Sequence, residues 1–160
     1  MITIRKANVR DWNIMLQWEN NPMLWEVTDN AGPFAQDDII EFLKEKNSLN
    51  HVGQERWIIE DIANPIGMID LFEWNREENA IGIGIAIPET QFRKQGYATQ
   101  ALTIMHNVLF EKYHILFFHC LIHPENEGSI QLFKKLGYQK TEEHIHRNKR
   151  VHLYKKKFQS

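Results

Sequence analysis

Residues 80–99 read Ala-Ile-Gly-Ile-Gly-Ile-Ala-Ile-Pro-Glu-Thr-Gln-Phe-Arg-Lys-Gln-Gly-Tyr-Ala-Thr, and this stretch decides the fold. The first eight residues alternate, so isoleucines occupy one face of a predicted strand and only alanine and glycine occupy the other. Glycine weakens a strand unless another group approaches its backbone closely. The bare face therefore predicts either a tightly packed helix or a slender ligand beside this strand.

The loop after this strand carries two cations and a glycine immediately before a predicted helix over residues 96–113. The first amide groups of a helix have no partners within it, and the helix dipole attracts anions. Gly96 allows a ligand to approach the backbone closely, while Arg93 and Lys94 add positive charge. The segment favours a pyrophosphate site, although it matches neither Walker A nor the Gly-x-Gly-x-x-Gly dinucleotide fingerprint.

The rest of the chain predicts a mixed α/β fold. Strands are expected at residues 2–5, 57–60, 66–74, 80–87, 115–122, 138–142 and 151–155. Helices are expected at residues 12–18, 37–46, 96–113 and 126–136. Asp11 and Asn126 are the expected N-caps of two of these helices, and residues 47–54 are expected to form a turn. Short polar turns between the middle strands indicate a mostly antiparallel sheet of about seven strands in a single domain, residues 1–160.

The composition is that of an ordinary globular domain, but the charged residues are unevenly distributed between the two halves of the chain. Of 160 residues, 42% are hydrophobic and 25% are charged. Residues 1–90 hold 7 Lys and Arg against 16 Asp and Glu, a balance of −9, whereas residues 91–160 hold 12 against 5, a balance of +7. This distribution argues against a uniformly basic nucleic-acid-binding protein and allows an anion site and a cation site on one molecule.

Several classes of protein and site are not expected. The single cysteine, Cys120, excludes an intramolecular disulfide and a cysteine-based zinc site. Neither a signal-peptide pattern nor an apolar run of about 18 residues is present, so we expect a cytoplasmic protein with no membrane partner.

His144 and His146 share a strand face without an obvious third ligand, so no metal is expected. The basic residues 155–157 are interpreted as a solubilising strand end, with no nucleic-acid partner. Exposed strand edges and five tryptophans leave a homodimer open.

The loop sequence Arg93-Lys94-Gln95-Gly96-Tyr97-Ala98 resembles the acetyl-CoA signature Arg/Gln-x-x-Gly-x-Gly/Ala of the GNAT acyltransferase superfamily. Downstream, residues 126–129 (Asn-Glu-Gly-Ser) and 132–138 (Leu-Phe-Lys-Lys-Leu-Gly-Tyr) are similar to the family's Asn-x-x-Ser/Ala helix that ends in Leu-Gly-Phe. Residues 4–7, 18–20 and 66–71 also resemble this family, so the likeness spans nearly the whole chain. It is greatest for the branch of ribosomal-protein and spermidine/diamine acetyltransferases, and leans toward the diamine type.

This resemblance implies direct transfer of acetyl from acetyl-CoA to an amine. The pantetheine arm would lie between the splayed fourth and fifth strands, against Ile85, Ala86 and Ile87. The further residues assigned to the cofactor are Arg93, Lys94, Gln95, Gly96, Tyr97, Ala98, Thr99, Asn126, Lys134 and Lys135. For each of the last two lysines, a solvated helix face is an equal alternative.

Two residues that many relatives use for acid–base chemistry are replaced in this chain. Phe133 stands where a tyrosine protonates the leaving thiolate, and Ile81 stands where a glutamate precedes the first glycine of the fourth strand. Ser129 is a candidate replacement donor or an ordinary hydroxyl in the first turn of a helix. Asp70, a carboxylate among apolar strand residues, would deprotonate or orient the amine, or else bind a loop. Water-mediated proton transfer is a third option.

The acidic half of the chain contains the expected acceptor pocket, which this family builds largely from the first two helices, their connection and the middle strands. Carboxylates and aromatic rings suit a cationic amine, and Glu19 and Trp25 are the individual predictions. A solvated acidic surface over core tryptophans is the alternative. We therefore predict a polyamine such as spermidine as the acceptor. A ribosomal or other protein N-terminus and a non-catalytic acyl-CoA-binding module are the competing functions.

Overall fold

The computed structural model describes residues 1–22, 33–146 and 148–159. Its elements in chain order are β1 (Ile2–Lys6), η1 (Val9–Asp11), α1 (Trp12–Glu19), α3 (Gln36–Glu41), η2 (Phe42–Lys46), α4 (Leu49–Val52), β2 (Glu55–Asp61), β3 (Asn64–Asn75), β4 (Ala80–Ala86), η3 (Thr90–Phe92), α5 (Tyr97–Tyr113), β5 (Phe117–Ile122), α6 (Glu127–Lys135), β6 (Gln139–His146) and β7 (Lys149–Lys157). All seven predicted strands are present, and the α/β class is confirmed. No helix among the described residues is long and apolar enough to cross a membrane.

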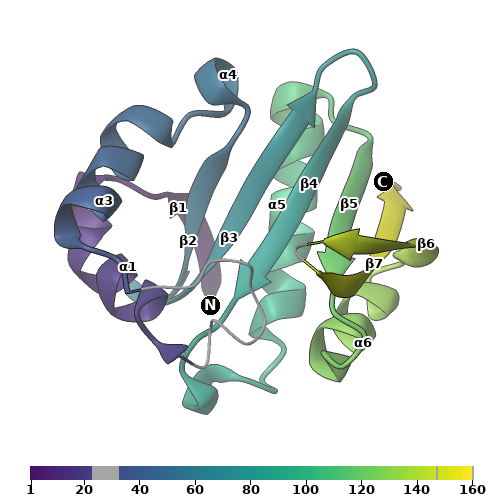
Figure 1. Cartoon of the computed structure of the whole chain (residues 1–160). Coiled ribbons are helices and arrows are strands. Elements are labelled where there is room, and N and C mark those ends of the chain that lie inside the picture. Colours follow the sequence, from purple (N-terminus) through teal and green to yellow (C-terminus); the bar gives the residue numbers. More distant parts are fainter. Residues whose placement is uncertain (23–32, 147, 160) are drawn as a thin grey trace.

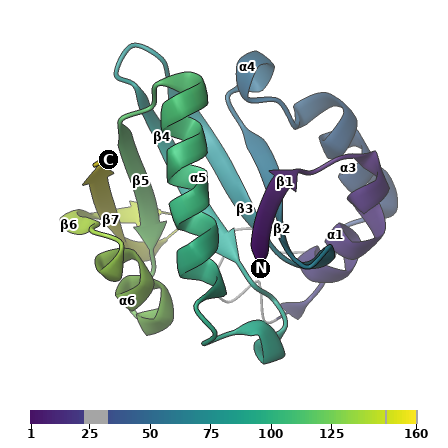
Figure 2. The same cartoon turned by 180° about the vertical axis from the view of Figure 1, so that it is seen from behind.

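The seven strands form one sheet in the order β1-β2-β3-β4-β5-β7-β6 (Figure 1). Neighbouring strands are antiparallel except for β4 and β5, which are parallel. The connection between these two parallel strands contains α5, which lies in front of the sheet in Figure 2, on the face turned away from the viewer in Figure 1. α1 and α3 cover the opposite face, at the end of the sheet that holds β1 to β3.

The isoleucine face of β4 is the packed one. Ile81 and Ile83 are fully buried in a core that also contains Leu102, Met105 and Leu109 of α5. Removing these side chains from water is the main favourable contribution to packing the helix on the sheet. The predicted strand faces are therefore correct, and α5 lies on the isoleucine side rather than on the glycine side.

The glycine face of β4 is closed at one position and open at the next. A Cβ atom at Gly82 would lie 2.3 Å from a ring carbon of Phe72 on β3, so this glycine makes room for an aromatic ring. At Gly84 the nearest atom to such a Cβ lies 4.0 Å away. The bare face thus becomes accessible at Gly84, where the site described below begins.

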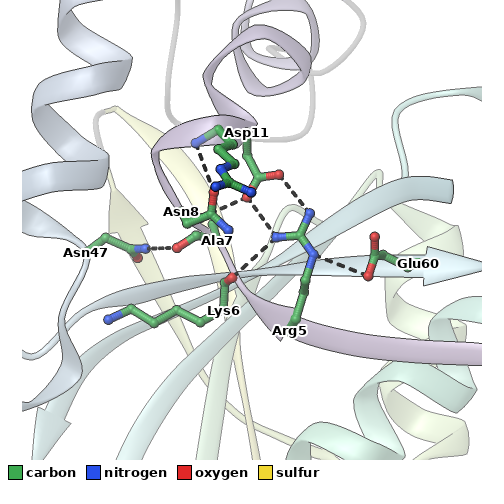
Figure 3. Close-up of polar contacts among 8 residues, drawn as sticks. Arg5, Lys6, Ala7, Asn8, Asp11, Asn47 and Glu60 are labelled. Carbon is green, nitrogen blue, oxygen red and sulfur yellow. Dashed lines mark hydrogen bonds and ion pairs between the residues drawn. The ribbon is translucent and has the colours of Figure 1, made fainter. Parts of the chain in front are cut away.

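Three local details differ from the sequence-based predictions. The helix expected over residues 37–46 is divided into α3 and the π-helical turn η2. The turn expected over residues 47–54 contains the short helix α4. Asp11 precedes α1 but makes no side-chain cap. Its carboxylate instead accepts hydrogen bonds from the Asn8 amide and the Arg5 guanidinium (Figure 3), because a capping box over residues 8–11 directs it back toward β1.

Candidate active site

The parallel strands β4 and β5 separate soon after they begin. Their pairing covers only Ala80 to Gly82 on β4 and Phe117 to His119 on β5. The rest of β4, residues 83–86, pairs with β3 on its other edge, and the rest of β5, residues 120–122, pairs with β7. The carboxyl ends of the two strands stand apart in Figure 1. Backbone amide and carbonyl groups on the inner edge of β4 are therefore placed to pair with an extended, amide-bearing ligand.

A cavity of about 710 Å³ opens beside this gap. Its walls come from α1 and α3, from the middle strands, and from β5 with the first turns of α6. Gly84 lines it, as its bare face predicts. The residues predicted from sequence that line this cavity are Glu19, Asp70, Ile85, Ala86, Asn126 and Ser129. The fold thus brings the predicted acceptor residues and the predicted pantetheine strand to one continuous space.

The charged lining of this cavity is mostly acidic. The charged residues among its described lining are Glu19, Asp38, Glu55, Arg56, Asp70 and Glu73. Glu55 is paired with Lys6 at 3.6 Å. The other four carboxylates against one guanidinium favour a cation in this partly enclosed space, where charges interact more strongly than in bulk water.

Arg56, a mostly buried residue of the cavity lining, donates hydrogen bonds to two of these carboxylates. Its Nε donates to Asp70 Oδ1 at 2.6 Å and its terminal nitrogen NH2 donates to Asp70 Oδ2 at 2.9 Å. Its other terminal nitrogen, NH1, donates to Glu19 Oε1 at 2.6 Å. Burial alone would lower the pKa of Arg56, but the carboxylates of Asp70 and Glu19 raise it above its usual value. The guanidinium is therefore a permanent cation held between two acids.

The loop before α5 has a backbone shaped for an anion. Lys94 and Gly96 both have positive φ angles, 60° and 78°, within three residues. Such left-handed residues turn neighbouring amide groups toward a common point. Gly96 occupies the N-cap position of the 17-residue helix α5 and has no side chain to cap it. The helix amides and the loop amides therefore remain available to a phosphate-bearing ligand.

The profile of the family described as "Acetyltransferase (GNAT) domain" matches residues 2–139. The chain belongs to the GNAT acetyltransferase family. It is an acetyl-CoA-dependent N-acetyltransferase of that type, and the splayed strands, the glycine-containing loop and the cavity are the features of this GNAT domain that could hold the cofactor.

Solved structures of similar proteins show the same fold. Spermidine N-acetyltransferase from Vibrio cholerae, in complex with CoA and spermine, has a TM-score of 0.84 at 18% identity over 98% of this chain and 95% of that one. RimL, a ribosomal L7/L12 alpha-N-protein acetyltransferase in complex with coenzyme A, has a TM-score of 0.86 at 16% identity, covering 98% and 93%. The aminoglycoside acetyltransferase AAC(6')-Ib with coenzyme A has a TM-score of 0.82 at 16% identity, covering 98% and 95%. No curated protein sequence matches the chain.

The basic residues predicted for the GNAT cofactor lie at the surface, and one of them has a clear structural role. Arg93 Nε donates to the Ile87 carbonyl at 2.9 Å and its NH2 donates to the Pro88 carbonyl at 3.3 Å. Arg93 therefore fastens the loop to the end of β4. Lys134 and Lys135 are exposed in the last turn of α6, which keeps both the phosphate-contact and the solvated-face interpretations open.

Other predicted loop residues contact their own neighbourhood. Tyr97 donates its hydroxyl to Asp61 at 3.2 Å, and the N-terminal ammonium group of Met1 also contacts Asp61 at 3.1 Å. Gln95 donates its side-chain amide to the Gln91 carbonyl at 2.6 Å. These bonds hold the loop beside the start of β1 and the end of β2. The side chains brace the loop, while Ala98 and Thr99 lie in the first turn of α5.

The donor side of the GNAT cavity contains Asn126, Ser129 and Phe133. Asn126 caps α6 by accepting from the Ser129 amide at 3.2 Å, so the predicted cap is confirmed. No tyrosine lines the described part of the cavity. The nearby Tyr138 is buried and bonds His106 at 2.7 Å instead. Burial raises the pKa of the Cys120 thiol to about 12, so that lining residue is a neutral thiol at physiological pH.

Several lining residues were missed from sequence, among them Arg56 and His123, and one prediction lies outside the described residues. Arg56 and His123 both line the cavity but belong to no motif. Arg56 could have been found only from strand pairing, since its partner across the sheet is Asp70. Trp25 lies outside the described residues. Among the described residues, no three His, Cys, Asp or Glu side chains gather as metal ligands would.

Proposed function

We propose that this GNAT enzyme acetylates a cationic primary amine, with a polyamine such as spermidine as the acceptor. The charge of the cavity is the observation that carries the proposal. Asp70 leaves 40% of its side chain exposed within the acidic lining. An ammonium group there gains a charge-assisted hydrogen bond in a partly enclosed site. The wide cavity has room for a flexible chain with further amino groups.

The cofactor assignment follows the shape of the backbone. The pantetheine arm would run along Ile85, Ala86 and Ile87, and the amides of residues 95–99 would bind the pyrophosphate. Asn126 would contact the pantetheine or the backbone beside it. Inner-edge amides of β4 would polarise the thioester carbonyl as negative charge develops on its oxygen.

The transfer itself needs a neutral amine. Its nitrogen forms the new C–N bond at the thioester carbon, the C–S bond breaks, the amine releases one proton and the thiolate accepts one. Ser129 lies in the cavity wall beside Asn126 and is the proposed proton donor to the sulfur. Water carries the proton from the amine. Phe133, buried beside Ser129, keeps that end of the cavity apolar.

An adjoining groove favours a second candidate, a protein N-terminus. This groove has a volume of about 940 Å³ and shares five described lining residues with the first cavity: Phe72, Glu73, Leu121, His146 and Val151. The lysines and carboxylates of its described lining are residues 155–157, all lysines, against Glu73 and Glu78. Lysines oppose a second polyamine ammonium but attract an acidic peptide segment that follows an acetylated N-terminus.

A panel of amines distinguishes these acceptors. Acetyl-CoA is mixed with spermidine, spermine, kanamycin, or a short acidic peptide with a free N-terminus, and release of CoA thiol is followed over time. The proposal predicts fast turnover of the two polyamines. Turnover of the peptide alone would overturn it in favour of the second candidate. Thermal stabilisation by acetyl-CoA without thiol release for any amine would indicate a non-catalytic module.

Two variants test whether the acceptor binds in the cavity. Asp70→Asn removes the exposed carboxylate, and Glu77→Gln removes a carboxylate from the exposed turn after β3, away from the cavity lining. Only the first should reduce turnover of spermidine. Equal activity in both variants would contradict acceptor binding at Asp70.

A further inference from the structure

Arg56 is buried while the carboxylate that it holds is not. The exposed fraction of its side chain is 8%, compared with 40% for Asp70. Arg56 and Asp70 face each other across the antiparallel pair β2–β3. The backbone of Arg56 is fixed as well, because its amide donates to Asn47 Oδ1 at 2.6 Å and its carbonyl accepts from the Ala7 amide at 2.9 Å.

The guanidinium has little freedom to reorient. Two parallel bonds join it to Asp70, a third bond joins it to Glu19, and the Phe42 ring lies 5.5 Å from its central carbon. A planar fork that makes two bonds to one carboxylate fixes the plane of that carboxylate as well as its position. Asp70 is therefore held rigidly at the cavity wall, with its remaining acceptor capacity directed away from Arg56.

The charges of these three side chains do not cancel. Glu19 and Asp70 carry two negative charges and Arg56 carries one positive charge, so one negative charge remains. A bound ammonium would neutralise the group. A carboxylate whose orientation is fixed by two charged hydrogen bonds is a well-placed partner for a cation.

We propose that Arg56 is a positioning residue for the acceptor, which holds Asp70 in one orientation so that Asp70 binds an ammonium group of the acceptor. This inference rests on the proposed function, because it assigns the contact by which that cavity recognises its amine. Glu19 acts behind Arg56 by fixing the far side of the guanidinium.

The test compares the same conservative change in two arginines. Arg56→Lys keeps the positive charge but loses the two-bond fork, and Arg5→Lys makes the same change in a two-bond pair with Asp11, which does not line the cavity. Steady-state kinetics are measured with spermidine, spermine and the acidic peptide. Arg56→Lys should raise KM for the amine about 10-fold, with kcat and the KM for acetyl-CoA within twofold of wild type. Arg5→Lys should leave all three values unchanged.

A double-variant cycle tests whether Arg56 acts through Asp70. In an Asp70→Asn background, Arg56→Lys should cause no further rise in KM, because the group that it positions has been removed. Independent, multiplying effects would overturn the inference. A fall in kcat with unchanged KM for the amine would also overturn it, since that pattern assigns proton removal to Asp70.

A second variant covers the case in which Arg56→Lys does not fold. The pair of changes Glu19→Gln and Arg56→Met leaves one negative charge on Asp70 but removes the fork. Its KM for the amine should also rise about 10-fold relative to wild type, whose three side chains carry the same net charge. An unchanged KM would show that net charge suffices and would overturn positioning.

Spermine binding to the CoA-loaded protein, measured by calorimetry, separates this inference from the proposed function. If wild type turns over no amine, the proposed function fails. Positioning still predicts spermine binding that weakens about 10-fold in Arg56→Lys. Equal binding by the two proteins, or no binding by wild type, overturns it.

Discussion

Two arginine–aspartate pairs of the same chemistry have opposite orientations in this protein. In the pair near the N-terminus, Arg5 donates two bonds to Asp11, at 2.8 and 2.7 Å, and a third contact reaches Glu60 (Figure 3). Here the carboxylate is the buried partner, with 8% of its side chain exposed, and the guanidinium lies nearer the surface at 34%. In the cavity pair the guanidinium of Arg56 is buried and the carboxylate of Asp70 is exposed.

This difference separates a structural contact from a recognition contact. Asp11 also accepts the Asn8 amide at 2.8 Å, so its oxygens are used within the fold. The first pair therefore fastens η1 to β1 and offers solvent a cation that already has carboxylate partners. The second pair offers the cavity an anion. Burying the arginine and exposing the aspartate leaves a carboxylate accessible in the cavity, as the proposed binding of an ammonium group requires.

The largest effect should come from removing the exposed carboxylate. Asp70→Asn is expected to reduce kcat/KM for spermidine about 100-fold, because the ammonium loses a charged partner in a partly enclosed site. Steady-state kinetics with calorimetric acetyl-CoA binding as the folding control would check this. Asp11→Asn is the matched control and should change kcat/KM less than twofold. A comparable loss in both variants would remove the functional distinction between the pairs.

For the free energy of unfolding, we expect the larger loss in Asp11→Asn and the smaller loss in Asp70→Asn. Asp11→Asn is expected to lower the free energy of unfolding by about 2 kcal/mol, because a buried amide replaces a carboxylate that accepts charged hydrogen bonds. Urea unfolding followed by tryptophan fluorescence would measure the loss. Asp70→Asn should cost less, since its side chain is partly solvated. A larger loss for Asp70→Asn would show that the cavity pair is mainly structural.

The last prediction concerns how the stability contribution of Asp11 changes at acidic pH. Burial would raise the pKa of Asp11, but the hydrogen bonds from Arg5 and Asn8 and the charge of Arg5 lower it below its usual value. Its stabilising contribution is therefore complete above the unfolded pKa of about 4 and is lost as pH falls through the lower folded value. The stability difference between wild type and Asp11→Asn should shrink from about 2 kcal/mol toward zero as pH is lowered through this range. Urea unfolding at several pH values would measure it, and a constant difference would contradict the assignment.

Much of the fold could be predicted from sequence because its signals are local. The alternation of isoleucine with glycine and alanine in β4 identified the packed face, and the apolar spacing in α5 identified the helix that covers it. The glycine before α5 and the asparagine before α6 were found in the same way. Asp70 was recognised as unusual because it interrupts an apolar strand. Each of these observations involves residues within a few positions of one another.

The partners of the charged residues could not be predicted in this way. Asp11 follows the pattern of a helix cap, yet it binds Arg5, and Arg56 has no neighbouring motif at all. Strand register and helix placement decide these contacts, because Arg56 meets Asp70 across 14 residues and Glu19 across 37. The local alternation, loop spacing and motifs of the sequence predicted the GNAT fold, and they also predicted which backbone segment would bind acetyl-CoA. Only the tertiary structure decided which charge of each pair is buried, since burial depends on the elements that pack around it.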